Sequence, residues 1–260
     1  MEVLNETIFA GTDLTFLTVI FLAVIAFGTS MLSAIIGMAG GIVLLGFMLL
    51  FLEPIDAIPL HGAIQLASNS SRAVVQRKHL AWPLIWRYSI LLLPAGVLGL
   101  WIVLDTPSAV LKAMIAVFVL IATWKREWLR LGKPETIAVN RRFLLLGAFA
   151  GFLNILVGAV GPMIAPFFLQ IGLKRQAIVG TKAACQTLGH LVKLVLFGLA
   201  GFAFGAYVWV FGLMVPMVIL GTWVGSKLLD RVNEQAFLWT YRIALTAVAS
   251  WLLVQVAFVE

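Results

Sequence analysis

Two short polar stripes inside otherwise apolar segments hold the residues best placed to do chemistry. They share the spacing i, i+4, i+8 and i+11 and consist of His61, Gln65, Asn69 and Arg72, and of Lys182, Gln186, His190 and Lys193. At 3.6 residues per turn, each stripe lies on one face of a helix. The stripes hold cationic or neutral groups and no carboxylate. Their expected ligand is therefore an anion rather than Na⁺, and we expect the two faces to line a cavity within the membrane.

The cations and their neighbours also allow a plainer interpretation. Lys182 lies under two turns from the expected membrane interface, where it either contacts an anionic substrate or snorkels to the headgroups. Arg72 is close to a basic loop, which favours snorkelling over a place in the substrate pathway. Asn69, His190 and Lys193 are candidates for an anion pathway, although the last two could instead cap loop carbonyls.

The amides and the first histidine have two interpretations each. Gln65 and Gln186 can donate to and accept from the oxygens of an anion, or they can bond to other helices. His61 could carry a proton because imidazole changes charge near neutral pH. As a lone intramembrane histidine it is more often a hydrogen-bonded packing residue.

A glycine-rich break precedes a short apolar segment in each half of the chain. The breaks span 37–41 and 158–162, and the segments that follow, 42–52 and 162–171, are too short to cross a membrane alone. We expect two half-helices whose first turns, at Ile42 and Pro162, present unpaired N–H groups to an anion. Five glycines would let the backbone approach that ligand, or would serve only close helix packing: Gly37, Gly40, Gly41, Gly158 and Gly161.

Composition indicates the solvent in which these elements fold. The chain has 260 residues, of which 62% are hydrophobic and 11% charged, whereas a water-soluble domain is about half apolar and a quarter charged. We therefore predict an all-α integral membrane protein. The net charge of +7 would fit nucleic acid only if it gathered on one exposed face, so no nucleic-acid partner is expected. The single Cys185 excludes an internal disulfide, and no metal or other cofactor is expected.

Ten apolar segments separated by polar punctuation are the candidate helices, and between seven and ten of them would span. They cover 14–36, 42–52, 57–76, 80–104, 108–122, 143–157, 162–171, 177–198, 206–225 and 237–258. The short segment 143–157 could pair with 162–171 in a re-entrant hairpin. The acidic start of the chain lacks a cationic n-region, so we expect the first segment to be a retained span rather than a cleaved signal peptide.

The basic residues set the expected orientation, because cytoplasmic loops retain Lys and Arg. With the N-terminus outside, the loops around 77–78, 125–142, 174–175 and 227–231 all lie inside. The acidic positions Glu53, Asp56 and Asp105 then lie outside. We predict a multi-pass protein of the cell (inner) membrane, and a homo-oligomer is compatible with it.

The sequence indicates an internal duplication. The hydrophilic stretch 124–142 is expected to be a cytoplasmic linker between a first membrane repeat, 1–123, and a second, 143–260. A shift of 121 residues without a gap superposes six identical pairs: Gly37 and Gly158, Gly40 and Gly161, Phe47 and Phe168, Leu52 and Leu173, Ala63 and Ala184, and Gln65 and Gln186. Glu53 is assigned outside and its counterpart Lys174 inside. The repeats are therefore predicted to be inverted, as in many secondary transporters.

The repeated pattern resembles the TauE/SafE sulfite-exporter family over nearly the whole chain. The resemblance rests on the glycine-rich breaks, the half-helices and the turns Pro59-Leu60-His61-Gly62 and Val179-Gly180-Thr181-Lys182, repeated across a basic central loop. It implies a membrane permease for sulfite, for sulfonates such as sulfoacetate, or for related sulfur-containing anions. The chain departs from the fuller three-glycine form at Ala39 and Pro162.

Four function classes compete. A secondary transporter that exports a small sulfur-containing anion by alternating access fits best, and an anion channel of the same architecture is the alternative. An assembly subunit would not need duplicated broken helices. No catalytic residues and no enzyme activity are expected, since the sequence lacks a His-Glu-x-x-His motif, a nucleophile elbow and a nucleotide-binding loop.

Overall fold

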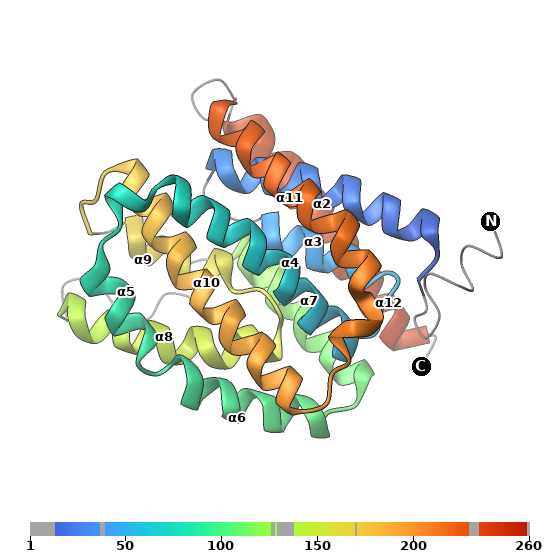
Figure 1. Ribbon diagram of the computed structural model, residues 1–260. Helices are drawn as coiled ribbons and strands as arrows, with labels where there is room; N and C mark the ends of the chain where they lie inside the picture. Colours follow the sequence, from blue (N-terminus) through green and yellow to red (C-terminus); the bar gives the residue numbers. More distant parts are fainter. Residues whose placement is uncertain are drawn as a thin grey trace.

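The computed structural model describes residues 14–36, 40–125, 128, 138–169, 171–228 and 234–258. Within these ranges it contains helices and no strand, so the predicted all-α class is confirmed. The helices, labelled in Figure 1, are α2 (Phe16–Ile36), α3 (Gly40–Met48), α4 (Pro54–Val75), η1 (Arg77–His79), α5 (Trp82–Ser89), α6 (Leu92–Asp105), α7 (Ser108–Trp124), α8 (Val139–Leu156), α9 (Gly161–Leu169), α10 (Arg175–Leu199), η3 (Phe204–Tyr207), α11 (Val208–Leu228) and α12 (Glu234–Phe258).

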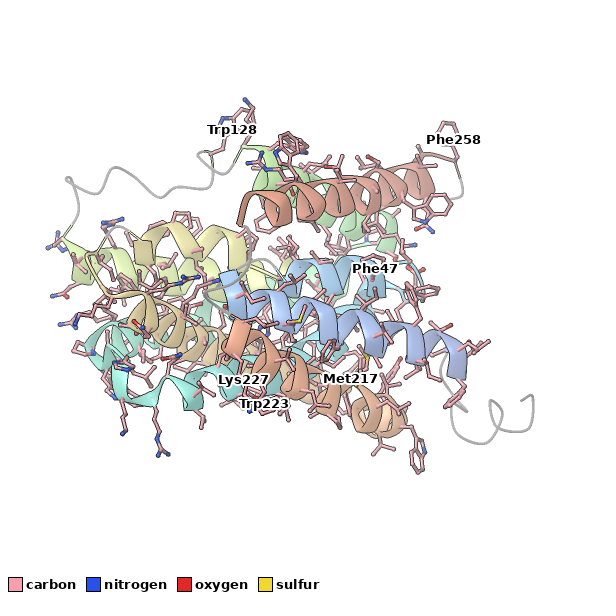
Figure 2. The ribbon with its side chains drawn as sticks, turned by 90° about the horizontal axis from the view of Figure 1, so that it is seen from above. Phe47, Trp128, Met217, Trp223, Lys227 and Phe258 are labelled. Carbon is pink, nitrogen blue, oxygen red and sulfur yellow. The ribbon has the colours of Figure 1, made fainter. Side chains whose placement is uncertain are left out.

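The outside of the molecule is apolar and aromatic, while polar side chains lie within. Trp82, Trp86 and Trp101 are each more than 60% exposed, and Figure 2 shows Trp223 and Phe258 projecting from the surface. Lys227 lies 3.5 Å over the Trp223 ring, also visible in Figure 2. Such a surface suits lipid with an interfacial belt of Trp and Lys.

Three helical stretches among the described residues are long and apolar enough to cross a membrane alone. They are Phe16–Ile35, Val139–Leu156 and Phe204–Leu228, and the bent pair α5 and α6 makes a fourth if it forms one span. Helices α4 and α10 have 22 and 25 residues, long enough to span. Their polar stripes lower their mean hydropathy and keep them out of this set.

The helix boundaries repeat at the 121-residue shift seen in the sequence. Helices α3 and α9 have nine residues each, beginning at Gly40 and at Gly161. Helices α4 and α10 follow N-caps that are 121 residues apart, Glu53 and Lys174. The backbone at these caps is nearly identical, with φ −66° and ψ 152° at Glu53 and φ −63° and ψ 154° at Lys174.

The packing pairs also map onto one another under that shift, with the two halves exchanged. Helix α2 packs on α11 as its counterpart α8 packs on α6, and α3 packs on α12 as α9 packs on α7. Small residues permit these close approaches. A Cβ at Gly221 of α11 would lie 2.2 Å from the Phe27 carbonyl oxygen of α2, and one at Gly151 of α8 would lie 2.4 Å from that of Leu92 of α6.

Helices α4 and α10, equivalent in the two halves, pack antiparallel at the centre (Figure 1). Near the start of α4, a Cβ at Gly62 would lie 2.7 Å from Lys193 Cδ, late in α10. Just beyond the end of α4, the Ala81 backbone N–H donates to Thr181 Oγ1, early in α10, at 2.9 Å. We call the end with Arg77, Lys78 and Arg175 the basic end, and the opposite end, with Glu53, the acidic end.

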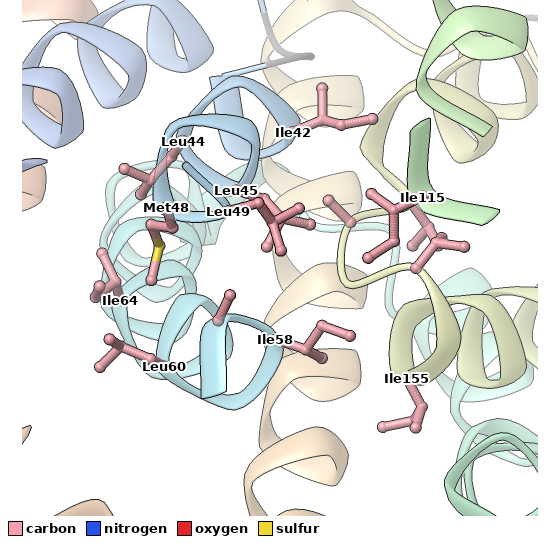
Figure 3. Packing of buried hydrophobic residues seen from close by; sticks show 14 of the residues in the cluster. Ile42, Leu44, Leu45, Met48, Leu49, Ile58, Leu60, Ile64, Ile115 and Ile155 are labelled. Atoms are coloured by element: carbon pink, nitrogen blue, oxygen red, sulfur yellow. The ribbon is translucent and has the colours of Figure 1, made fainter. Parts of the chain in front are cut away.

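The short helix α3 is held by apolar contacts all round rather than by one amphipathic face. Leu44, Leu45 and Met48 are fully buried. Figure 3 shows them among Ile58, Leu60 and Ile64 of α4, with Ile115 of α7 on the other side. Most of this apolar half-helix is therefore buried, while Val43 and Phe47 are half-buried, and the packing fixes its first turn at the middle of the molecule.

Three element predictions differ from the structure. The segment 80–104 is two helices bent by 41°, because Pro94 lacks an N–H and its ring crowds the carbonyl of Ile90. The helix expected at 143–157 begins at Val139 and has 18 residues, so it is not too short to span. Its Arg142, assigned to the linker, is buried with its guanidinium 5.5 Å from the Phe167 ring. The two half-helices begin at Gly40 and Gly161 rather than at Ile42 and Pro162.

Candidate functional site

A polar pocket lies where the first turns of α3 and α9 meet the stripes of α4 and α10. Its volume is about 20 Å³. Nine of the sequence-predicted site residues line it: Gly41, His61, Gln65, Asn69, Arg72, Gly161, Lys182, Gln186 and His190. The lining contains no Asp or Glu.

Both half-helices point their N-terminal turns at this pocket, as the sequence predicted. Gly41 and Ile42 line it from α3, and Gly161 and Pro162 from α9. The first N–H groups of a helix have no partner within the helix, and its dipole places partial positive charge there. Two such ends therefore favour a negative ligand between them.

Each half-helix has a glycine against the glutamine of the neighbouring stripe. A Cβ at Gly41 would lie 3.2 Å from Gln65 Cδ, and a Cβ at Gly161 would lie 3.3 Å from Gln186 Nε2. The two glycines thus let one amide from each half lie close to a helix end. Asn69 Nδ2 donates to the Gln65 carbonyl oxygen at 2.9 Å and to Gln65 Oε1 at 3.3 Å, which orients that side chain.

Arg72 is buried, at 4% exposed, so it does not snorkel. Its guanidinium donates to Ser68 Oγ at 3.2 Å, Asn69 Oδ1 at 3.1 Å and the Ser33 carbonyl oxygen at 3.4 Å. Charge-assisted hydrogen bonds are usually 2.7–2.9 Å long. No described carboxylate lies within 4.0 Å of it. Arg72 is therefore a buried cation that is loosely held by neutral acceptors.

Lys182 is 3% exposed and lines the pocket, which likewise disagrees with snorkelling. By the 121-residue shift it is the counterpart of His61. The pocket thus receives one cation from each half, Lys182 from α10 and Arg72 from α4. The lining itself contains no carboxylate.

The two histidines meet across the α4–α10 contact. Their ring centroids are 5.9 Å apart, at an interplanar angle of 79°. His61 Nε2 donates to the Gly41 carbonyl oxygen at 2.8 Å, because a carbonyl can only accept. This bond ties the α4 stripe to the first turn of α3. His190 Nδ1 is buried and has no hydrogen-bond partner among the described residues.

Three predicted site residues that the structure describes do not line the pocket. Lys193 is fully buried and donates from Nζ to the Gly158 carbonyl oxygen at 2.6 Å, so it fixes the break before α9. A Cβ at Gly40 would lie 2.0 Å from the Thr29 carbonyl oxygen, so Gly40 serves packing against α2. Gly158 has φ +76°, a backbone conformation that favours glycine. Gly37 lies outside the described residues.

The sequence reasoning missed the contribution of α2. Ser33 lines the pocket and its carbonyl accepts from Arg72. Ser30 Oγ is hydrogen-bonded to Ser68 Oγ at 3.0 Å. The spacing of Thr29, Ser30 and Ser33 in an otherwise apolar helix was the signal that could have found this face.

No group of three or more His, Cys, Asp or Glu side chains that could hold a metal ion occurs among the described residues. Cys185 is fully buried beside the pocket lining. The pocket lining provides hydrogen-bond donors and positive charge. That combination can bind and release a small oxyanion.

Of the comparisons with known proteins, the one with protein families gives a match. A family model described as Sulfite exporter TauE/SafE matches residues 22–252. No curated protein and no solved structure matches the chain.

Proposed function

The chain belongs to the TauE/SafE sulfite exporter family, and from that premise we propose that it is a secondary transporter that exports a small sulfur-containing anion by alternating access. Family membership implies a membrane permease for such an anion, with the lipid bilayer as its solvent. The substrate proposed is sulfite, sulfoacetate or another organosulfonate.

One observation carries the proposal: the first turns of α3 and α9, together with Arg72 and Lys182, surround a pocket that has no acidic residue in its lining. Sulfite and sulfonate groups each present three oxygens that accept hydrogen bonds. We assign Arg72, Lys182, Gln65 and Gln186 as donors to them. Charge-assisted hydrogen bonds of this kind are about twice as strong as neutral ones.

The proposed transport cycle rests on two inverted repeats, 1–123 and 143–260, joined by a cytoplasmic linker, 124–142. Support comes from the helix boundaries that recur at 121 residues and from the antiparallel packing of the equivalent helices α4 and α10. In inverted-repeat transporters, one repeat moves against the other around a site near the membrane midplane. The proposed orientation has the N-terminus outside and the basic end in the cytoplasm of the cell (inner) membrane.

An anion channel of the same architecture is the competing function. The acidic end of the α4–α10 pair is filled by Ile58, Ile155 and Phe197, each at most 1% exposed. A channel needs a continuous path, whereas alternating access needs one end closed. The buried acidic end therefore favours the transporter.

The test is flux through proteoliposomes that contain the full-length chain, with sulfite, sulfoacetate, taurine, thiosulfate and chloride as candidate substrates. We expect saturable flux of sulfite or of an organosulfonate and little flux of chloride. Large unitary currents would support the channel. Flux of none of the sulfur anions would contradict the proposal.

Lys182→Met tests the site itself. A buried cation facing the substrate is replaced by an apolar side chain of similar length, so flux should fall at least about tenfold, the loss of one charge-assisted hydrogen bond. Gel filtration in detergent checks that the variant stays folded. Unchanged flux in a folded variant would remove Lys182 from the site.

A further inference from the structure

A second polar cavity lies at the basic end and is distinct from the central pocket. It lies between the ends of α2, α4, α10 and α11 and has a volume of about 20 Å³. We call this cavity the vestibule, and its polar lining consists of Arg72, Gln76, Arg175, Gln176 and Ser226. No Asp or Glu lines it.

Arg72 lines both cavities. On the side of the central pocket its neighbours are Ser33 and Asn69. On the side of the vestibule they are Ala34, one residue after Ser33, and Gln76, seven residues after Asn69. One guanidinium therefore forms part of the wall between the two spaces.

The second cation of the vestibule has a fixed position. Arg175, the first residue of α10, donates from Nη2 to the Ile35 carbonyl oxygen of α2 at 3.0 Å. Arg72 donates to the Ser33 carbonyl oxygen two residues earlier in the same helix. Both guanidiniums are thus anchored by the last turn of α2, one behind the other along the direction that leads from the basic end to the pocket.

We propose that the vestibule is a second binding site for the transported oxyanion, occupied between the aqueous phase at the basic end and the central pocket. The inference rests on the proposed function for the identity of the anion. Planar guanidinium groups bind oxyanions through paired N–H donors, and the exposed amide of Gln176 adds a neutral donor.

Arg72 then passes the anion from one site to the other. Its five N–H donors point in several directions from one planar group. Its bonds to neutral acceptors are long, at 3.1–3.4 Å, and are readily exchanged for a bond to an anion. An oxyanion held by Arg175 on one side can therefore engage Arg72 before it leaves Arg175, so no step exposes an unsolvated anion.

The test uses radiolabelled sulfite and membrane vesicles from cells that make the full-length chain, in inverted and right-side-out form. Arg175→Gln should raise the half-saturating sulfite concentration roughly three- to tenfold in inverted vesicles, where the basic end faces the medium. In right-side-out vesicles the change should stay below about twofold. Arg175→Lys, which keeps the charge, should restore most of the affinity.

A matched control is Lys174→Gln, which removes the same charge one residue earlier and outside the cavity lining. It should leave the sulfite profile near that of the unaltered chain. If Arg175→Gln does not insert, Gln176→Glu at an exposed position places a carboxylate in the vestibule and should weaken sulfite uptake from the basic end in the same way.

An Arg175→Gln or Gln176→Glu profile that matches the Lys174→Gln control would overturn the second site while the proposed function stands. An equal effect from both sides of the membrane would also overturn it. Absence of saturable sulfite flux by the unaltered chain would overturn the proposed function and the second site with it.

Discussion

The two ends of the α4–α10 pair are built on one register but differ in what fills them. The vestibule positions Ala34, Arg72, Gln76 and Val179 at the basic end correspond, 121 residues away, to Ile155, Lys193, Phe197 and Ile58 at the acidic end. The first set lines a cavity, where Gln76 and Val179 are half-buried, whereas their counterparts Phe197 and Ile58 are fully buried. The two ends thus share one backbone arrangement, but the side chains leave a cavity at the basic end and fill the acidic end.

The difference shows which cation is placed to bind the anion and which one holds the backbone in position. Arg72 has long bonds to neutral acceptors and lines both cavities, whereas its counterpart Lys193 is fully buried and makes a 2.6 Å bond to the Gly158 carbonyl oxygen. The equivalent positions 72 and 193 therefore have different roles. Such an asymmetry is expected of an alternating-access transporter, because each conformation gives access to the site from one side only.

Replacing each of the two cations separately gives the strongest test of this difference. Arg72→Met should lower sulfite flux at least about tenfold in a folded protein, because a donor to the anion is lost. Lys193→Met should instead lower the free energy of unfolding by about 1–3 kcal/mol, because the buried Gly158 carbonyl loses its partner.

Flux per folded molecule and thermal unfolding in detergent measure these two effects separately. The folded fraction of Lys193→Met should keep its half-saturating sulfite concentration. If both variants lost flux equally with no change in unfolding, the distinction between the two cations would be wrong.

The apolar counterparts should differ from each other in their effect on stability. Ile58 is fully buried, so Ile58→Ala should lower the free energy of unfolding by about 2–4 kcal/mol. Val179, its equivalent at the basic end, is half-buried and lines the vestibule, so Val179→Ala should change it by less than about 1 kcal/mol. Chemical denaturation of the two variants compares them, and equal losses would mean that both ends are packed alike.

The smallest effect concerns the cap at the acidic end. Partial burial raises the pKa of Glu53, but hydrogen bonds from Ser108 and Lys112 and the charge of Lys112 outweigh it and hold this pKa below its ordinary value. A carboxylate with a lowered pKa stabilises the fold above its ordinary pKa of 4.5, and this stability is lost as the pH falls through the lowered value.

Glu53→Gln should therefore destabilise the protein at pH 7 by about 0.2–1 kcal/mol, the range for exposed ion pairs, because Glu53 is half exposed. The difference from the unaltered chain should vanish at acid pH, below the lowered pKa. Unfolding temperatures measured from pH 7 downward check the sign, and a difference that grows on acidification would contradict it.

Periodicity in the sequence predicted much of the site. The spacing of the stripes placed His61, Gln65 and Arg72 on one face, and the same spacing placed Lys182, Gln186 and His190 on another, which the structure brings into one pocket. The 121-residue shift between glycine breaks predicted two short helices at matching places. These are local properties of the chain, and local patterns are what a sequence displays directly.

The rest depended on neighbours that no spacing reveals. Snorkelling was the favoured interpretation for Arg72 because its distance from a basic loop is visible in the sequence, whereas the covering α2 helix with Ser33 is not. Gly40 and Gly41 are adjacent, yet one meets the α2 backbone and the other a glutamine of the pocket. The break at Ile90 had a local signal, Pro94, which the apolar run around it obscured.

The central claim is that two oppositely oriented repeats share one anion pocket, and the two N-caps test it most directly. Glu53→Cys and Lys174→Cys would each be labelled with a membrane-impermeant thiol reagent from one side of the membrane at a time. The native Cys185 is fully buried and should give little background. We predict that Glu53→Cys reacts only from outside and Lys174→Cys only from inside. Reaction of both from the same side would contradict the inverted arrangement and the pocket built on it.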